Sequence, residues 1–305
     1  MLARQLLNYD VPSAVDRDAL AHAFEHFIRR EVPYETVSNL VLSRLVKSAA
    51  EMVETVADGL GGHCVEHAVL LTEFLRELGF DARFANADYH DRVSGRSTAM
   101  AKPLCLVRVG ETLFVADPYY RQVLLPVPRE GELRVGRFVV VRKNDEEFWI
   151  QALKLDAAGA GQGAVLNEDH VHALSTLHDR CRLFEARYAE FSPFGITAPY
   201  FQLMRPVRKA LFYDPEQDCL VDCDPVAVRE LQSEDLAKCE WIPERVRHLV
   251  LEFVGRSRAM RPAARRFLAR GEYAPHYLQL ERRSQHMTES DNASSHIRGE
   301  SNDHR

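Results

Sequence analysis

A cysteine stands directly after two glycines and opens an apolar helical pattern in the segment GGHCVEHAVLLTEFLRELGF, residues 61–80. At the first turn of a helix, unpaired backbone N–H groups and the positive end of the helix dipole favour the thiolate, which is the nucleophilic form of cysteine. The alternative is that Cys64 is a small buried hydrophobic residue. The paired glycines allow close approach of backbone and substrate, so we predict a nucleophile at Cys64.

The segments expected to position this cysteine have the sequence pattern of helices. Residues 17–30 and 37–57 carry apolar side chains at helical spacing, and a third helix is expected from Cys64 to Gly79, where glycine is suited to a left-handed cap. These segments predict a small helical bundle.

From Phe80 onward the apolar period changes to two, which is typical of strands. Five such segments are separated by Gly- and Pro-containing breaks and predict an antiparallel sheet or barrel: FDARFAN, PLCLVRV, TLFVADPYY, RFVVVRK and EFWIQALKL. Further along, we expect a small-residue linker at 156–167 and a helical patch at 168–189. Strands follow in ALFYDP and CLVDCDP, and helices at 226–237 and 243–254.

Composition excludes several classes of protein. The 305 residues are 46% hydrophobic and 28% charged, with a net charge of -6, so a nucleic-acid partner is not expected. Neither a signal-like N-terminus nor an apolar run long enough to cross a bilayer is visible, so we expect a cytoplasmic protein without membrane contact. Among six cysteines, only Cys219 and Cys223 are close, and they lack a second pair at zinc spacing; no metal site is expected.

Three motifs resemble those of the arylamine N-acetyltransferases. VPYET at 32–36 matches their Pro-aromatic-Glu-Asn motif, with Thr in place of Asn. GGHCVE at 61–66, followed by LGF at 78–80, matches Arg-Gly-Gly-x-Cys-x-Glu. FVADPYY at 114–120 matches a strand that ends in an acidic residue, here Asp117. Order and spacing fit over roughly residues 5–120, and the remainder fits loosely.

The resemblance implies an α+β protein with a cysteine-protease-like core. Its parts are a helical bundle at 1–82 carrying Cys64, an antiparallel β-barrel at 83–190 carrying Asp117, and an α/β lid at 191–281; a disordered tail is expected at 282–305 because it is almost without apolar residues. The family's Cys-His-Asp triad takes an acyl group from acyl-CoA onto the thiolate and passes it to an amine. Acetyl-CoA or another acyl-CoA is then a co-substrate, an amine is the acceptor, and an acyl carrier protein is an alternative donor.

The family's histidine is missing from this chain. Counting back from Asp117, its position falls at or next to Lys102, and no histidine lies between residues 90 and 170. Lys102 is the positional replacement, although a lysine accepts a proton only where burial lowers its pKa. His67 is the second candidate because residues i and i+3 share a helix face with Cys64. His90 is a third, in the polar segment DYHDRVSGR at 88–96, which is expected to be a loop that can fold over the site.

Other departures also surround the expected site. Leu60 stands where the family has arginine, and PYY at 118–120 stands where it commonly has Gly-Phe-Gly. We interpret Glu35 and Glu66 as buried structural carboxylates. Three hypotheses follow: an acyltransferase acting through Cys64, a binding or regulatory protein on an impaired acyltransferase fold, and a divergent cysteine thioesterase or amidase.

Overall fold

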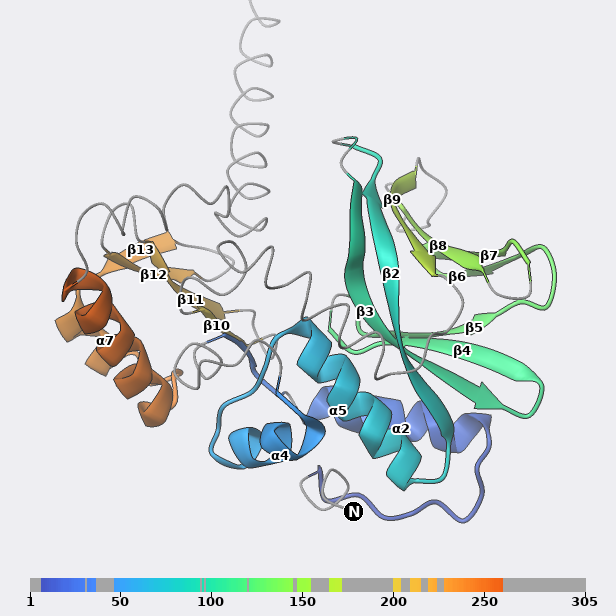
Figure 1. Cartoon of the computed structure of the whole chain (residues 1–305), viewed down its shortest axis with the longest axis horizontal. Coiled ribbons are helices and arrows are strands. Elements are labelled where there is room, and N and C mark those ends of the chain that lie inside the picture. The colour runs from blue at the N-terminus through green and yellow to red at the C-terminus, as the bar shows by residue number, and fades with distance from the viewer. Residues whose placement is uncertain are drawn as a thin grey trace, which may run out of the picture.

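A computed structural model of the chain gives the fold. It describes residues 7–30, 32–36, 47–93, 95, 97–119, 121–144, 147–154, 165–171, 200–203, 209–214, 219–223 and 228–259. Two sheets, a group of N-terminal helices and a C-terminal helical segment make up the described part (Figure 1). The expected tail at 282–305 and residues 172–189 of the expected helical patch lie outside it. Within the described ranges, no helix is both long and apolar enough to cross a bilayer.

The N-terminal helices are α2 (Arg17–Arg29), α4 (Ala49–Ala57) and α5 (Cys64–Glu77). Side-chain caps fix where they begin: Asp16 accepts from the backbone of Ala19 at α2, and Ser48 and Glu51 form a capping box at α4. α5 ends before Gly79, whose φ of 93° is the left-handed conformation expected of that glycine. The helices predicted at 17–30 and from Cys64 are confirmed.

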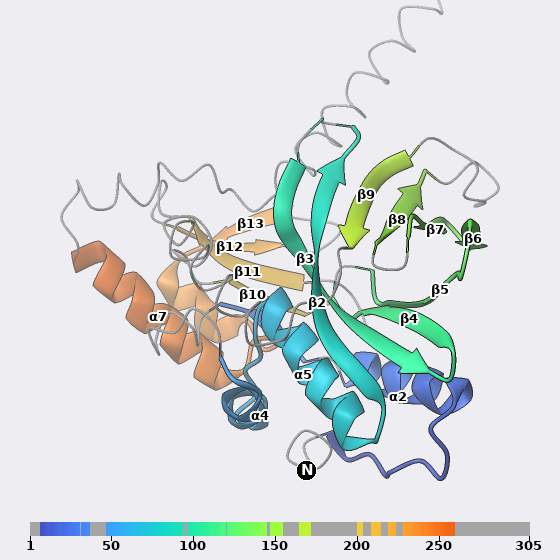
Figure 2. The ribbon, with the colours of Figure 1, turned by 45° about the vertical axis from the view of Figure 1, so that its right-hand side comes forward.

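The larger sheet has eight antiparallel strands in the order β5-β4-β3-β2-β9-β8-β7-β6. Its first and last strands approach each other, because β5 contacts β6 and β7, so the sheet is a nearly closed barrel (Figure 2). The strands are β2 (Asp81–Asp91), β3 (Ser97–Val109), β4 (Thr112–Asp117), β5 (Val123–Val127), β6 (Glu132–Val135), β7 (Phe138–Arg142), β8 (Phe148–Leu153) and β9 (Val165–Val171).

Alternate residues of these strands face two different cores. Inward-facing residues such as Leu104, Val115 and Val171 fill the barrel. Outward-facing residues such as Cys105 and Val107 pack against α2 and α5, which lies along β2 and β3 in both views. The barrel therefore presents one apolar face to the helix that begins at Cys64.

The smaller sheet has five strands in the order β1-β10-β11-β12-β13. They are β1 (Tyr34–Glu35), β10 (Tyr200–Leu203), β11 (Lys209–Asp214), β12 (Cys219–Cys223) and β13 (Val228–Leu231). The 3-10 helix η1 (Ser233–Lys238) and α7 (Glu244–Ala259) follow, and Leu60 joins their apolar cluster. The Pro-Tyr-Glu motif thus forms the edge strand of a sheet otherwise made by C-terminal residues.

Two helices expected from the sequence are wrong where the structure describes them. Residues 168–171 belong to β9, which pairs with both β2 and β8. Within 226–237, residues 228–231 pair with β12 as β13, and the 3-10 helix follows only from Ser233. In both places a partner strand supplies hydrogen bonds and packing that outweigh local helix propensity.

Candidate active site

Cys64 is the first residue of α5, as predicted. The preceding residue, His63, caps the helix through Nδ1, which accepts from the backbone N–H of Val65 at 3.3 Å. Only 9% of Cys64 is exposed, and it packs with Phe84 and the partly buried Tyr119. The thiol is therefore at a helix N-terminus within a largely apolar enclosure.

Both glycines before Cys64 are required by close packing of protein against protein. A Cβ on Gly61 would overlap the Pro33 carbonyl, and a Cβ on Gly62 would overlap the Glu66 carboxylate. The two segments also exchange hydrogen bonds, from Gly62 N to Pro33 O at 3.1 Å and from Glu35 N to Gly62 O at 3.1 Å. From the sequence we predicted that the glycines allow close approach of substrate. In the structure, the contacts that require them come from the 33–35 segment and from Glu66.

A buried lysine anchors the same turn. Lys47 Nζ donates to the carbonyl of Gly61 at 2.5 Å and lies 3.3 Å from Glu35 and 3.6 Å from Glu66, with all three charged side chains fully buried. Glu35 also accepts from Gly61 N at 3.2 Å, and Glu66 from Lys47 N at 2.6 Å. Both carboxylates are therefore structural, as interpreted from the sequence. Lys47 supplies a cation to this turn, where Leu60 stands in place of the family arginine.

Lys102 and Asp117 face the interior of the barrel near one end. Lys102 lies two residues before the inward-facing Leu104, and Asp117 lies two residues after the inward-facing Val115. Lys102 Nζ is 4.7 Å from the centroid of the Tyr89 ring, a cation–π contact. β3 and β4 thus turn both side chains toward the same space.

Burial and nearby charges shift the pKa of Lys102. Burial lowers the pKa of the Lys102 ammonium below its usual value, and the charges of Asp169, Asp117 and Cys64 partly oppose this. Arg121 lowers the pKa further. Asp169 and Asp117 thus have a larger influence on the pKa of Lys102 than Cys64 has.

Asp117 is buried, with 2% of its surface exposed. Its Oδ1 accepts from the backbone N–H of Tyr119 at 3.0 Å. Burial raises the pKa of the Asp117 carboxyl above its usual value, while Arg121 and Lys102 draw it down. The cations beside it favour the ionised form that a partner of Lys102 requires.

His67 is engaged elsewhere. Its Nε2–H donates to the Pro33 carbonyl at 3.1 Å, and its ring packs against Tyr34 and Tyr119, which stack on each other at 4.4 Å between centroids. Burial lowers the pKa of His67 to about 4, so the imidazole is neutral at physiological pH. This arrangement gives His67 a structural contact to the 33–35 segment.

The buried neutral state of His67 predicts a loss of stability in acid. The unfolded imidazole, with a pKa of 6.5, takes up a proton before the folded one does, so stability falls as pH drops from 6.5 toward 4. We expect the free energy of unfolding to be lower by about 2 kcal/mol at pH 5 than at pH 8 from this group alone. Urea titrations at both pH values should show that His67→Gln removes this component, whereas replacing the exposed His248 leaves it in place.

His90 also has other contacts. It lies in β2, its Nδ1 is 2.7 Å from the hydroxyl of Ser97, and its ring stacks on Trp149 at 5.8 Å. The expectation that it belongs to a loop over the site is wrong, because His90 pairs with Ser97 of β3 and with Glu168 of β9.

Three residues of the site region were missed from the sequence: Lys47, Arg121 and Asp169. Asp169 is fully buried in β9 and forms an ion pair with Arg121. No motif marks them. For Asp169, the sequence signal is the run of polar residues NEDH at 167–170, which lies inside strand β9.

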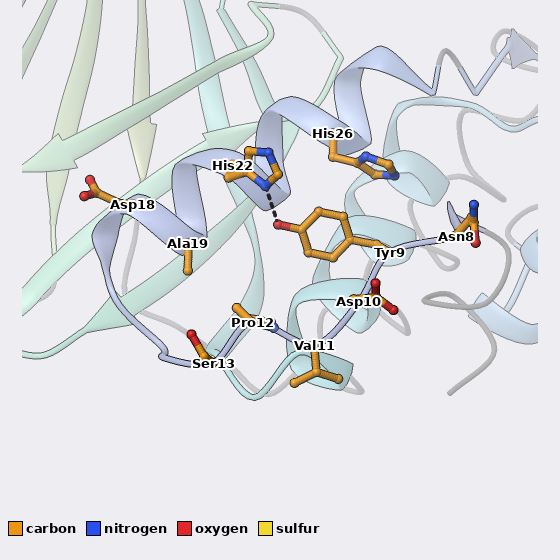
Figure 3. Close-up of a pocket in the computed structure, with 10 residues that line it drawn as sticks. All are labelled: Asn8, Tyr9, Asp10, Val11, Pro12, Ser13, Asp18, Ala19, His22 and His26. Carbon is orange, nitrogen blue, oxygen red and sulfur yellow. Dashed lines mark hydrogen bonds between the residues drawn. The ribbon is translucent and has the colours of Figure 1, made fainter.

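A separate surface pocket lies against α2. It is lined by the segment 8–13 and by the first turns of the helix, and Tyr9 extends across it to within 2.7 Å of His22 Nδ1 (Figure 3). None of the four predicted site residues lines this pocket.

Comparison with known proteins gives one family. A family model described as N-acetyltransferase matches residues 16–156, a range that includes Cys64, Lys102 and Asp117. No curated protein matches the chain closely enough to count as a relative.

Solved structures of arylamine N-acetyltransferases share the fold. The Mycobacterium abscessus protein is 15% identical with a TM-score of 0.59, covering 83% of this chain and 94% of its own. The Nocardia farcinica protein is 17% identical with a TM-score of 0.56 and the same coverage. A Bacillus cereus protein described as having a unique Cys-His-Glu catalytic triad is 14% identical with a TM-score of 0.55, covering 78% of this chain and 94% of its own. The chain therefore has the fold of the arylamine N-acetyltransferases, as its three motifs predict, and its residues 16–156 match the N-acetyltransferase family model.

Proposed function

We propose that this protein transfers an acyl group from a CoA thioester to an amine through Cys64, with Lys102 replacing the family's histidine and Asp117 as its carboxylate partner. The match of residues 16–156 to the N-acetyltransferase family model supports acyl transfer in general. The observation that carries the specific proposal is the placement of the half-buried Lys102, which faces the barrel interior at the same end as Asp117, at the position where the motifs call for histidine.

The chemistry needs one group that takes up and returns a proton. Neutral Lys102 accepts the proton of the Cys64 thiol, giving an ammonium–thiolate pair. The thiolate attacks the thioester carbonyl and the CoA thiolate departs, taking the proton from Lys102. The amine then attacks the Cys64 thioester, Lys102 takes the amine's proton, and the Cys64 thiolate is released.

Two features make a lysine workable in this role. Burial lowers the pKa of Lys102, which brings its neutral form closer to the working pH. The N-terminus of α5 favours negative charge on Cys64, so the proton need not be removed by a strong base. Lysine serves as the base beside a nucleophile in other enzymes that lack histidine.

The pH dependence of Cys64 alkylation by iodoacetamide tests the thiolate, and acetyl-CoA with an aromatic amine tests turnover. Cys64→Ala is the blank, and Cys105 should contribute little because burial raises its pKa to about 12. We expect rapid alkylation at neutral pH that is absent from Cys64→Ala, and N-acetylated amine as product.

The other outcomes identify the competing functions. Acetate released faster than acetylated amine indicates a thioesterase. An unreactive thiol, with no acyl-enzyme detected by mass spectrometry from acetyl-CoA or from an acetylated carrier protein, contradicts the proposal and favours a binding protein.

A further inference from the structure

A second carboxylate lies beside Lys102, on a strand that none of the three motifs contains. Asp169 lies in β9 directly opposite Tyr89 of β2. The centroid of the Tyr89 ring is 4.7 Å from Lys102 Nζ. Paired residues on neighbouring strands have Cβ atoms about 4.5–5.5 Å apart. Asp169 also lies two residues before the inward-facing Val171, so it points into the barrel as Lys102 does.

The two carboxylate oxygens of Asp169 differ in their contacts. The residue is fully buried, and Oδ2 forms an ion pair with Nη1 of Arg121, whose side chain is only 7% exposed. Oδ1 accepts no hydrogen bond from any described residue. A buried carboxylate oxygen without a donor is costly unless a cation lies near it, and Lys102 is the second cation in this space.

We propose that Asp169 is a positioning residue for Lys102, and that Asp117 and Asp169 together hold the ammonium group beside the Cys64 thiolate. The inference rests on the acyl-transfer function proposed above. The Tyr89 ring of β2 contacts the Lys102 ammonium, and the charges that influence the pKa of Lys102 come from Asp169 of β9, Asp117 of β4, Arg121 and Cys64 of α5. Of the charges that favour the ammonium form, Asp169 has the largest influence on the pKa of Lys102.

Asp169→Asn tests the role, because it removes the charge and keeps the size. We expect the titration of Lys102, followed by NMR of ¹³C-labelled lysine and assigned with Lys102→Met, to move down by about one pH unit or more. Alkylation of Cys64 at pH 7 should fall by about tenfold, because the ammonium–thiolate pair loses a counter-charge.

Glu168→Gln is the matched control. Glu168 is the adjacent buried carboxylate of β9, but it is held by Arg92 and Gln151 on the opposite face of the strand. The Glu168→Gln substitution should leave both the Lys102 titration and the rate of Cys64 alkylation unchanged. A purely structural role for Asp169 would move neither readout in the folded Asn variant, and that result overturns the inference.

Asp169→Ser covers the case in which Asp169→Asn does not fold, because it also removes the charge. The Lys102 titration should move down in this variant as well; no movement overturns the inference. If the Lys102 titration moves but the wild-type protein forms no acyl-enzyme, the inference stands and the proposed function fails. If turnover occurs while the Lys102 titration is unchanged, the inference alone fails.

Discussion

Lys102→Met is expected to slow acylation of Cys64 by acetyl-CoA about 10²–10⁴-fold, the usual contribution of a positioned general base. Methionine has a similar length and no proton-accepting nitrogen, so packing in the barrel changes little while proton transfer is lost. Rapid-quench measurement of the acyl-enzyme, with the protein in excess over acetyl-CoA, isolates this step from release of product.

Two further substitutions separate charge from proton transfer. Lys102→Arg retains a cation that does not deprotonate, so Cys64 alkylation should persist while acyl transfer remains slow. Lys102→His puts the family's imidazole beside Asp117 and should restore a larger part of the rate than Lys102→Arg does. Equal acylation rates in the wild-type protein and Lys102→Met would remove Lys102 from the mechanism.

The largest loss of stability is expected from Lys47→Met. Removing the ammonium leaves Glu35 and Glu66 buried without their shared cation, and breaking a buried ion pair in this way costs about 3–5 kcal/mol. The free energy of unfolding should fall by that amount in urea titrations monitored by circular dichroism. Because Lys47 also binds the Gly61 carbonyl, Cys64 should become slower to alkylate in the folded fraction.

Lys238→Met provides the comparison. Lys238 pairs with Asp235 at 2.6 Å, but its side chain is 78% exposed, and surface pairs of this kind contribute little to stability because water screens them. Lys47→Arg should recover part of the lost stability. A cost for Lys47→Met no larger than that for Lys238→Met would show that the buried network does not stabilise the turn.

The helix at Cys64 and most barrel strands could be predicted because local patterns determine them. The apolar spacing after Cys64, the glycine at 79 and the two-residue alternation around Leu104 and Val115 each describe one element by itself. The Glu35 and Glu66 interpretation was also accessible, because both residues occupy motif positions.

The partners that come from distant segments were not predictable in this way. Lys47 meets Glu66 across 19 residues, and Asp169 meets Arg121 across 48. A single sequence carries no signal for such pairs. β9 and β13 were misread for the same reason: their strand character comes from neighbours that local propensity does not include.

The short strand β1 has a mechanical consequence for access to the thiol. One of its residues, Glu35, both pairs with β10 and donates to Gly62 in the turn before Cys64, so the five-stranded sheet is joined to that turn. Leu60 adds an apolar connection to the cluster around α7. A hinge motion that carries the C-terminal sheet away from Cys64 would therefore have to break either the pairing of β1 with β10 or the hydrogen bond between Glu35 and Gly62.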